Sequence, residues 1–260
     1  MENRNNILYS VDSKIATITI NDAAKRNRLS YPMMRTIVDF VDEANKDDDV
    51  KVVVITGEGK EAFCSGADIG QFEADDIQKS RDTLLDAYTQ LCLVWTRLSK
   101  PSIAKICGYA LAGGCGLAMY PTFSIAAENA VFGLPEIKVG TWPMIVMATL
   151  FRVVGRKKGL EMCFTGDFIK AQEAEKIGMV NKVVPLDKID HEVSILCDKL
   201  KSLSASTMRF GLEAFYTMSD MEYSKATKYL REMATILTKT KDTVEGTRAF
   251  TEKRKPKWER

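Results

Sequence analysis

Histidine is the scarcest chemically useful residue of this chain, with His191 the single example among 260 residues. It lies in the polar segment 187–192, where a helix is expected to begin. We interpret it as a solvated residue of the first helical turn. Catalysis by a Ser-His or Cys-His pair is therefore disfavoured, and a metal site rich in histidine is excluded. No metal is expected.

Paired cysteines are missing as well. No Cys-x-x-Cys pattern occurs, so neither a disulfide framework nor a zinc site is indicated. Cys115 has no basic partner that would activate it as a nucleophile, so it is interpreted as a packing residue. The same holds for the other thiols, which all lie in apolar contexts: Cys64, Cys92, Cys107, Cys163 and Cys197.

Long apolar runs and nucleotide-binding patterns are absent too. No segment reaches the roughly 18 apolar residues of a membrane span, and residues 1–6 lack the apolar core of a signal peptide. Without Gly-x-Gly-x-x-Gly or P-loop patterns, nicotinamide cofactors and nucleoside triphosphates have no support. The net charge of +2 favours neither nucleic acid nor a membrane surface as partner. We expect a cytoplasmic protein.

The order of the predicted elements indicates an α/β fold. A hairpin is expected over residues 7–20 and a buried parallel strand over 50–56. Strand-like runs alternate with helices until about residue 184, and only helices are predicted beyond residue 186. This order predicts an α/β core over residues 1–200 and a helical region over 201–260.

A glycine-rich turn at residues 106–120 is the most distinctive stretch. A short strand at 102–106 leads into Gly108, Gly113, Gly114 and Gly116. The helix that follows begins with backbone N–H groups that have no partner inside the helix, which suits an anion. The segment 57–70, predicted as a long loop, offers similar N–H groups at 64–68. Together the two loops suit the oxygen of a carbonyl that becomes an enolate; two ordinary turns are the alternative.

Three segments resemble the signatures of the crotonase (enoyl-CoA hydratase/isomerase) superfamily. They are residues 63–69, 108–116 and 132–137, in the family's order and spacing, and the resemblance covers nearly the whole chain. It implies a spiral of ββα units with a helical C-terminal trimerisation region. It also implies trimers or dimers of trimers, and an acyl-CoA thioester of fatty acid metabolism as substrate. CoA would enter with the substrate, so no separate cofactor is expected.

The resemblance also implies which residues bind the substrate. The N–H groups of Ala67 and Gly113 would form the oxyanion hole. The expected CoA contacts are Lys25, Arg26, Arg28, Ser65, Ala67, Asp68, Ile69 and Lys253. The four basic side chains suit the phosphates of CoA, and ordinary surface charge is the alternative for each.

One position departs from the pattern of the family's hydratases, which use two glutamates. Glu136 matches the second glutamate, but Gly116 stands where the first would be. Glu136 follows a proline in an apolar segment, where burial would raise its pKa toward the range useful for acid–base catalysis. Glycine supplies neither an acid nor a base.

A single carboxylate favours isomerisation of 3-enoyl-CoA to 2-enoyl-CoA, because one group can remove a proton and return it two carbons along. Hydration remains open, with Glu136 acting alone or with a substitute acid such as Asp68 or Glu73. Another enolate reaction, such as decarboxylation, and a non-catalytic CoA-binding homologue are further alternatives.

The segment after Thr141 also departs from the family, which has a glycine-rich turn there. Trp142 and Met144 are bulky and apolar, and an apolar helix is expected over residues 142–154. These two side chains would narrow and dry the acyl pocket, which disfavours an ordered water. A helix that serves only the core is the alternative.

Overall fold

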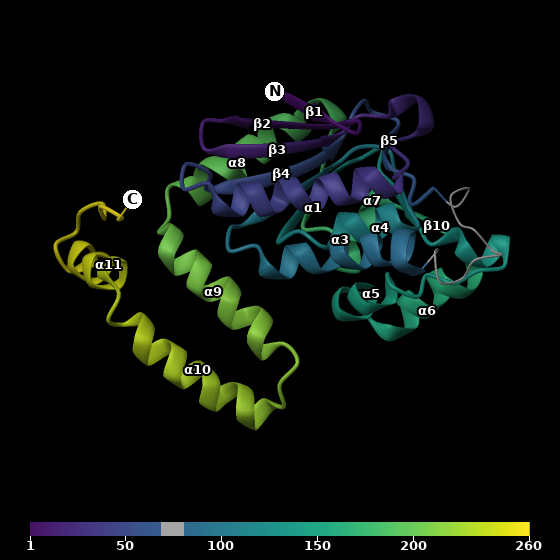
Figure 1. Cartoon of the computed structure of the whole chain (residues 1–260). Coiled ribbons are helices and arrows are strands. Elements are labelled where there is room, and N and C mark those ends of the chain that lie inside the picture. The colour runs from purple at the N-terminus through teal and green to yellow at the C-terminus, as the bar shows by residue number, and fades with distance from the viewer. Residues whose placement is uncertain (69–80, 260) are drawn as a thin grey trace.

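The computed structural model describes residues 1–68 and 81–259. Helices cover two β-sheets, and a helical arm extends from one end of them (Figure 1). The larger sheet has the order β1-β2-β3-β4-β6-β8-β11. Its strands are β1 (Glu2–Arg4), β2 (Ile7–Asp12), β3 (Ile15–Ile20), β4 (Val52–Gly57), β6 (Ser102–Ile106), β8 (Phe123–Ala127) and β11 (Lys182–Val184).

The pairing of the larger sheet confirms two predictions. β2 and β3 form the expected antiparallel hairpin, in which Ile7 lies opposite Ile20. β4 is parallel to both of its neighbours, β3 and β6. Because crossovers between parallel strands run over the faces of a sheet, β4 is buried on both sides, as its continuous β-branched run predicts.

Alternate residues of β4 point into two separate apolar clusters. Val53 and Ile55 belong to the main core, which includes the buried faces of α1 (Tyr31–Lys46) and α3 (Asp86–Arg97). Val52 and Val54 belong to a second cluster on the opposite face, completed by Ile189, Val193, Cys197 and Leu200 of α8 (Ile189–Lys201). The sheet therefore lies between two helical layers.

Helix α1 shows why these segments are helical. The side chain of Ser30 caps the first turn by accepting a hydrogen bond from the Met33 N–H, and Pro32 fits that turn because its missing N–H is not needed there. Met34, Ile37 and Val41 recur at helical spacing and are fully buried. Their spacing in the sequence predicts an apolar stripe on a helix over residues 31–44, and the structure confirms it.

The sequence predicts a helix over about residues 82–99, before the glycine-rich turn, with an apolar side formed by Leu85, Tyr88, Leu91, Cys92 and Trp95. The structure differs from this prediction at the start of the helix. The helix opens with a π-helical turn, η3 (Arg81–Leu85), before α3 begins. Tyr88, Leu91 and Trp95 are buried as expected, but Leu85 is 42% exposed. The wider π-turn changes the angular spacing of residues, so the predicted stripe does not extend back to Leu85.

A second, smaller sheet was not predicted. Its order is β10-β9-β7-β5, and each strand is three residues long: β5 (Ala62–Cys64), β7 (Tyr109–Leu111), β9 (Val131–Gly133) and β10 (Phe168–Lys170). The expected loop over residues 57–70 was therefore wrong at β5. Strands this short carry too little alternation to be recognised in the sequence.

Short helical elements connect the strands of the core. They are η1 (Ala23–Lys25), α4 (Gly113–Met119), η4 (Pro135–Val139), α5 (Met147–Val153), α6 (Arg156–Thr165), α7 (Ala171–Lys176) and η5 (Leu186–Lys188). The helix expected over 142–154 begins only at Met147, so its first turn was predicted wrongly. Residues 142–146 instead form tight turns, in which the Met144 N–H donates to the carbonyl of Trp142.

The C-terminal part of the described chain is helical, as predicted. α9 (Ala205–Met218) and α10 (Tyr223–Leu237) form an arm that stands away from the sheets, and α11 (Lys241–Thr251) lies beyond them (Figure 1). Apolar side chains remain exposed along this arm, including Phe215, Tyr223, Ile236, Val244 and Phe250. None of the helices in residues 1–68 and 81–259 has the length and hydropathy of a membrane span.

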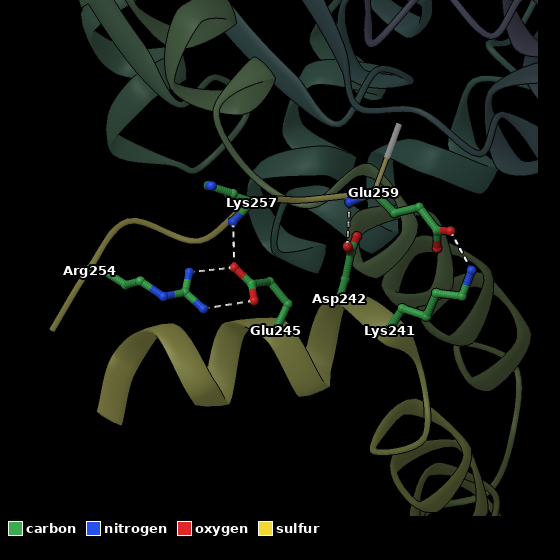
Figure 2. Close-up of a pocket in the computed structure, with 6 residues that line it drawn as sticks. All are labelled: Lys241, Asp242, Glu245, Arg254, Lys257 and Glu259. Carbon is green, nitrogen blue, oxygen red and sulfur yellow. Dashed lines mark hydrogen bonds and ion pairs between the residues drawn. The ribbon is translucent and has the colours of Figure 1, made fainter. Parts of the chain in front are cut away.

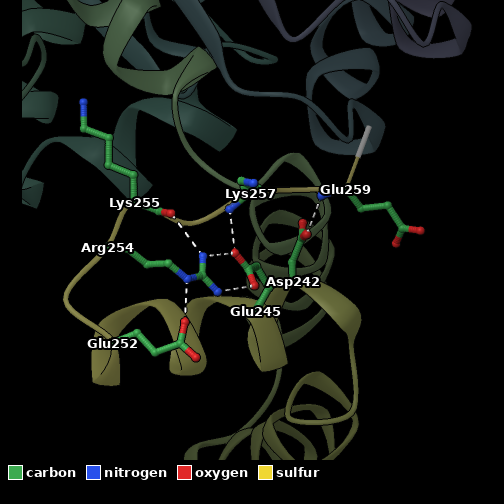
Figure 3. Close-up of polar contacts among 7 residues, drawn as sticks. All are labelled: Asp242, Glu245, Glu252, Arg254, Lys255, Lys257 and Glu259. Carbon is green, nitrogen blue, oxygen red and sulfur yellow. Dashed lines mark hydrogen bonds and ion pairs between the residues drawn. The ribbon is translucent and has the colours of Figure 1, made fainter.

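A polar cluster fixes the C-terminal tail to the start of α11 (Figure 3). The buried carboxylate of Asp242 accepts hydrogen bonds from the hydroxyls of Ser204 (2.6 Å) and Ser206 (2.7 Å) and from the Glu259 N–H (2.8 Å). Burial opposes its ionisation, but these bonds together outweigh burial and lower the pKa of Asp242 below 3.8. The tail thus returns to the junction before α9.

We expect Asp242→Asn to lower the free energy of unfolding by about 2 kcal/mol at neutral pH, because the buried hydroxyl of Ser204 and the hydroxyl of Ser206 lose an ionised acceptor. A lowered carboxyl pKa stabilises the fold fully above 3.8 and progressively less as pH falls through the folded value. The difference from wild type should therefore shrink in acid. Urea unfolding across this range measures it, with the exposed Asp220→Asn as control; equal losses at every pH would contradict the assignment.

Candidate active site

Three short parallel strands bring the predicted site residues to one edge of the smaller sheet. β5 is parallel to β7, and β7 is parallel to β9. Their carboxyl ends lead into residues 65–68, 112–116 and 134–136. Because parallel strands end on the same side, the segments containing Ala67, Gly113 and Glu136 meet there.

Close backbone contacts confirm that these loops touch. A Cβ atom built on Gly66 would lie 3.3 Å from the backbone nitrogen of Gly113, and one on Gly114 would collide with the carbonyl of Cys64. The Ala112 N–H donates to the carbonyl of Gly133, at the end of β9, over 2.9 Å. Ala112 itself has φ of 50°, a costly conformation for alanine that the surrounding contacts must hold.

The two predicted oxyanion donors are both available. The Leu29 N–H donates to the carbonyl of Gly66 (2.9 Å), and the Asp68 N–H donates to the carbonyl of Leu29 (2.8 Å). This parallel bridge turns the intervening N–H of Ala67 to the other side. Gly113 is the first residue of α4 and has no acceptor within the helix. Among the described residues, neither N–H makes a hydrogen bond.

Glu136 is a half-buried acid, one carboxyl oxygen of which has no partner. It lies in η4, and its Oε2 atom is buried with no hydrogen-bond partner among the described residues. Burial raises the pKa of Glu136 above its ordinary 4.5 and outweighs the opposing effect of a hydrogen bond from its own backbone. An unsatisfied buried carboxyl is rare in structural roles and is typical of acid–base sites.

The neighbouring thiol Cys115 is not a nucleophile. Burial, and then the charge of Glu136, raise the pKa of Cys115 to about 12. A thiol with this pKa stays protonated near neutral pH. The effect of Glu136 on Cys115 also shows that η4 lies within electrostatic range of α4.

The first polar loop lies beside the oxyanion loops. The Ser65 N–H donates to the carbonyl of Arg26 over 3.1 Å, and Arg28 forms an ion pair of 3.3 Å with Asp68. The Arg26 guanidinium lies 6.0 Å from the ring centroid of Tyr109. Lys25 and Arg26 are exposed at this rim, and Arg28 is half-buried.

Asn27 holds this loop in place, and sequence reasoning missed it. Its fully buried side chain donates to the carbonyls of Glu58 and Ala62 and accepts from the Asp22 N–H. With φ of 53°, it adopts a conformation that asparagine tolerates better than most residues. The only sign of its role in the sequence is that a single asparagine lies among three basic residues.

Other predicted site residues lie elsewhere. Lys253 follows α11, on the opposite side of the chain from β5, so a single chain does not bring it to Lys25 (Figure 1). Ile69, a predicted CoA contact, and Glu73, a possible substitute acid, fall outside the described residues. His191 is exposed on α8, as expected.

The two residues predicted for the acyl pocket behave differently from each other. Trp142 is half-buried, donates from its indole N–H to the Met147 sulfur over 3.0 Å and packs edge-on against Phe164. Met144 is 67% exposed. A contact of either residue with an acyl chain stays a prediction.

Gly116 is enclosed by two tyrosines. A Cβ atom built there would lie 2.5 Å from the hydroxyl of Tyr88 and 2.6 Å from that of Tyr120. Both rings are buried. Periodicity places Tyr88 on the apolar side of its helix, but nothing in the sequence pairs it with the glycine-rich turn.

A separate surface pocket lies between α11 and the C-terminal tail (Figure 2). Most of its charged side chains are paired: the Arg254 guanidinium bonds Glu245, Lys241 bonds Glu259, and Asp242 accepts a hydrogen bond from the Glu259 N–H. These contacts hold the tail against α11, so we interpret this pocket as part of the anchor for the tail.

Comparison with known sequences agrees with this geometry. The family described as enoyl-CoA hydratase/isomerase matches residues 10–260. A probable mitochondrial enoyl-CoA hydratase of Dictyostelium discoideum is 38% identical over 94% of this chain and 87% of its own length. A crotonyl-CoA hydratase of Syntrophomonas wolfei is 33% identical over 96% of each chain.

Solved structures share the fold over nearly the whole length. An enoyl-CoA hydratase from Mycobacterium smegmatis superposes with a TM-score of 0.93 at 29% identity, covering 97% of this chain and 98% of that one. Human enoyl-CoA hydratase domain-containing protein 3 also gives 0.93, at 28% identity, covering 98% and 100%. The predicted fold class is thereby confirmed.

Proposed function

Because the chain belongs to the enoyl-CoA hydratase/isomerase family of enzymes, we propose that it isomerises 3-enoyl-CoA to 2-enoyl-CoA with Glu136 as its single acid–base group. Two observations together carry this proposal: among the described residues, the buried Oε2 atom of Glu136 has no hydrogen-bond partner, and position 116 is a glycine. Proton transfer between two carbons needs only one such group.

The proposed reaction moves one proton and changes no atom count. The Glu136 carboxylate removes a proton from the carbon next to the thioester carbonyl. The electron pair moves to the thioester oxygen, and the dienolate is held by the N–H groups of Ala67 and Gly113. The Glu136 carboxylic acid then returns the proton two carbons along, so that the double bond becomes conjugated with the carbonyl.

Burial suits Glu136 to both halves of this reaction. A general base and acid works best when its pKa lies near the working pH, and burial shifts the pKa of Glu136 in that direction. Asp68 is a weaker candidate, because its carboxylate is paired with Arg28.

The basic loop supports binding of the CoA phosphates at the same edge. Lys25 and Arg26 are exposed, and Arg28 is half-buried, beside Ser65 and Asp68 in the oxyanion loops. Guanidinium groups bind phosphate oxygens through paired hydrogen bonds. The thioester can then reach Ala67 and Gly113 while the nucleotide stays at the surface.

We expect Arg26→Gln to raise KM for an acyl-CoA about tenfold with little change in kcat, because uniform binding is lost. The same acyl group on pantetheine, which lacks the nucleotide phosphates, should show no such increase. Arg35→Gln, which removes an exposed charge on α1, is the control. An equal rise in KM for both substrates would argue against a phosphate contact.

Hydration is the second candidate, favoured by the names of the relatives. The Dictyostelium and Syntrophomonas proteins are both called hydratases. Such a reaction would require Glu136 to activate water and deliver the proton alone, or a substitute acid. Initial rates on 3-enoyl-CoA and 2-enoyl-CoA of equal chain length separate the two: isomerisation creates the conjugated enoyl absorbance, and hydration removes it.

A trimer or a dimer of trimers is part of the proposal. The arm of α9 and α10 extends from the core with exposed apolar side chains, such as Phe215 and Ile236, which a neighbouring copy would cover (Figure 1). A role for Lys253 in binding CoA requires such a neighbour. The cytoplasmic location stays a prediction, since the Dictyostelium relative is named mitochondrial.

A further inference from the structure

A buried hydrogen-bond chain crosses the site beside the oxyanion turn. The Tyr88 hydroxyl donates to the carbonyl of Gly113 over 2.8 Å and contacts the Tyr120 hydroxyl over 2.9 Å, which in turn lies 2.9 Å from the Cys92 sulfur. Tyr88 and Tyr120 are 6% and 7% exposed. The proposed reaction uses neither tyrosine.

The direction of this chain follows from the number of hydrogens. A carbonyl only accepts, so the single hydroxyl hydrogen of Tyr88 is committed to Gly113. Tyr120 must therefore donate to Tyr88, and the Cys92 thiol donates to Tyr120. Every hydroxyl is satisfied, and the chain ends on a residue of the oxyanion turn.

The same ring explains the glycines at 113 and 116. A Cβ atom on Gly113 would lie 2.8 Å from a ring carbon of Tyr88, and one on Gly116 would lie 2.5 Å from the Tyr88 hydroxyl and 2.6 Å from that of Tyr120. Real Cβ atoms essentially never show contacts shorter than 3.0 Å. Tyr88 therefore fills the volume into which any side chain at position 116 would begin.

We propose that the Tyr88–Tyr120 pair determines reaction specificity by occupying the place of a second carboxylate, so that only single-carboxylate chemistry is possible. This inference rests on the proposed function for its chemical meaning. The inference explains more than the absence of an acid at position 116. The two tyrosine hydroxyls, which already bond other partners, fill the space that an acidic side chain and a water bound to it would need.

The tyrosines do not replace the missing acid. Burial raises the pKa of both hydroxyls well above the ordinary 10, so both stay protonated at neutral pH. The hydrogen of Tyr88 points to Gly113 rather than to a substrate. The pair holds the turn and excludes other groups, which makes Tyr88 a positioning residue.

The first test is thermal and needs no substrate. Gly116→Ala should lower the melting midpoint by about 5 °C, because one methyl group overpacks a filled site. Gly155→Ala, at an exposed position before α6 with φ of −59° and nothing within 4 Å, should change it little. The Tyr88→Phe/Tyr120→Phe variant lacks both close hydroxyls. In this variant, adding Gly116→Ala should lower the melting midpoint by less than about 2 °C.

The second test measures specificity. Gly116→Glu alone should gain no hydration of 2-enoyl-CoA, whereas Gly116→Glu combined with Tyr88→Phe and Tyr120→Phe should gain at least about tenfold over the tyrosine double variant. Equal hydration by Gly116→Glu with and without the tyrosine changes would overturn the proposal. So would a folded triple variant that gains none.

The two tests separate this inference from the proposed function. If the wild type does not isomerise 3-enoyl-CoA, the proposed function fails, but the thermal comparison still reports whether the tyrosines fill the site. If the triple variant does not fold, the thermal comparison decides alone. The inference would be overturned if Gly116→Ala melted at the same temperature as wild type. It would also be overturned if Gly116→Ala lowered the melting midpoint equally in wild type and in the Tyr88→Phe/Tyr120→Phe variant.

Discussion

Glu136→Gln is expected to lower kcat by about 10²- to 10⁴-fold while leaving the fold at least as stable as that of the wild type. The amide keeps the size of the side chain but cannot take a proton from carbon. Glu136 is also the one described acid at this edge whose buried oxygen lacks a partner. The loss should therefore appear in kcat for 3-enoyl-CoA, with little change in KM.

The pKa of Glu136 gives the sign of the stability change. Burial raises this pKa above 4.5, so the folded state binds the proton more tightly than the unfolded chain. Stability is unaffected while both states are protonated and decreases as pH rises from 4.5 through the folded pKa. At neutral pH the ionised carboxylate opposes folding, and glutamine removes that cost. A melting midpoint equal to or above that of wild type would show that lost activity is not lost structure.

The pH profile supplies an independent check. Since proton removal requires the carboxylate, kcat/KM should rise with pH through the pKa of Glu136, with its midpoint above 4.5. Glu128→Gln, an exposed glutamate after β8, should leave rate and profile unchanged. Turnover retained by Glu136→Gln would show that another group is the base.

Gly113→Pro is expected to lower kcat by about 10²-fold relative to Gly113→Ala, because only proline removes the N–H that would hold the dienolate oxygen. Both changes place a Cβ atom against the ring of Tyr88, 2.8 Å from the nearest ring carbon. The steric cost is therefore shared, and proline itself is tolerated at the first position of a helix. Proline also places a ring carbon where the N–H was, so the ratio of the two variants reports the loss of this donor together with that added carbon.

The alanine variant is the essential control, because the proline variant differs from wild type both in its added side chain and in its lost N–H. Circular dichroism and melting midpoints establish that both variants fold to a similar extent. If the proline variant turns over as fast as the alanine variant, the Gly113 N–H does not stabilise the transition state. Ala67 would then need another partner for the oxygen.

Local patterns in the sequence predicted much of the larger sheet and of the helices. The hairpin of β2 and β3 and the buried strand β4 follow from alternation and β-branched runs that are long enough to be distinctive. The stripe of α1 is equally clear. The smaller sheet was missed because its strands have three residues each, and their hydrogen bonds join segments that are far apart in the chain.

Some residues of the candidate site could be predicted from the sequence, and others could not. Ala67, Gly113 and Glu136 were predicted from motifs, since each lies in a segment that resembles a family signature; their catalytic roles stay predictions. Tyr88 was not, because its contact with Gly113 joins residues 25 apart in the sequence and depends on how α3 packs over α4. The sequence shows that Gly116 stands where the family's hydratases have a glutamate. Only the packing shows that the tyrosine hydroxyls fill the space beside this glycine.

The central claim is that this chain moves a proton between two carbons rather than adding water. Mass analysis of the first products formed from 3-enoyl-CoA and from 2-enoyl-CoA tests it most directly. The account predicts that 3-enoyl-CoA yields a conjugated 2-enoyl product of unchanged mass, and that 2-enoyl-CoA gains water far more slowly. A hydrated product that forms from 2-enoyl-CoA faster than the isomer forms from 3-enoyl-CoA would contradict it.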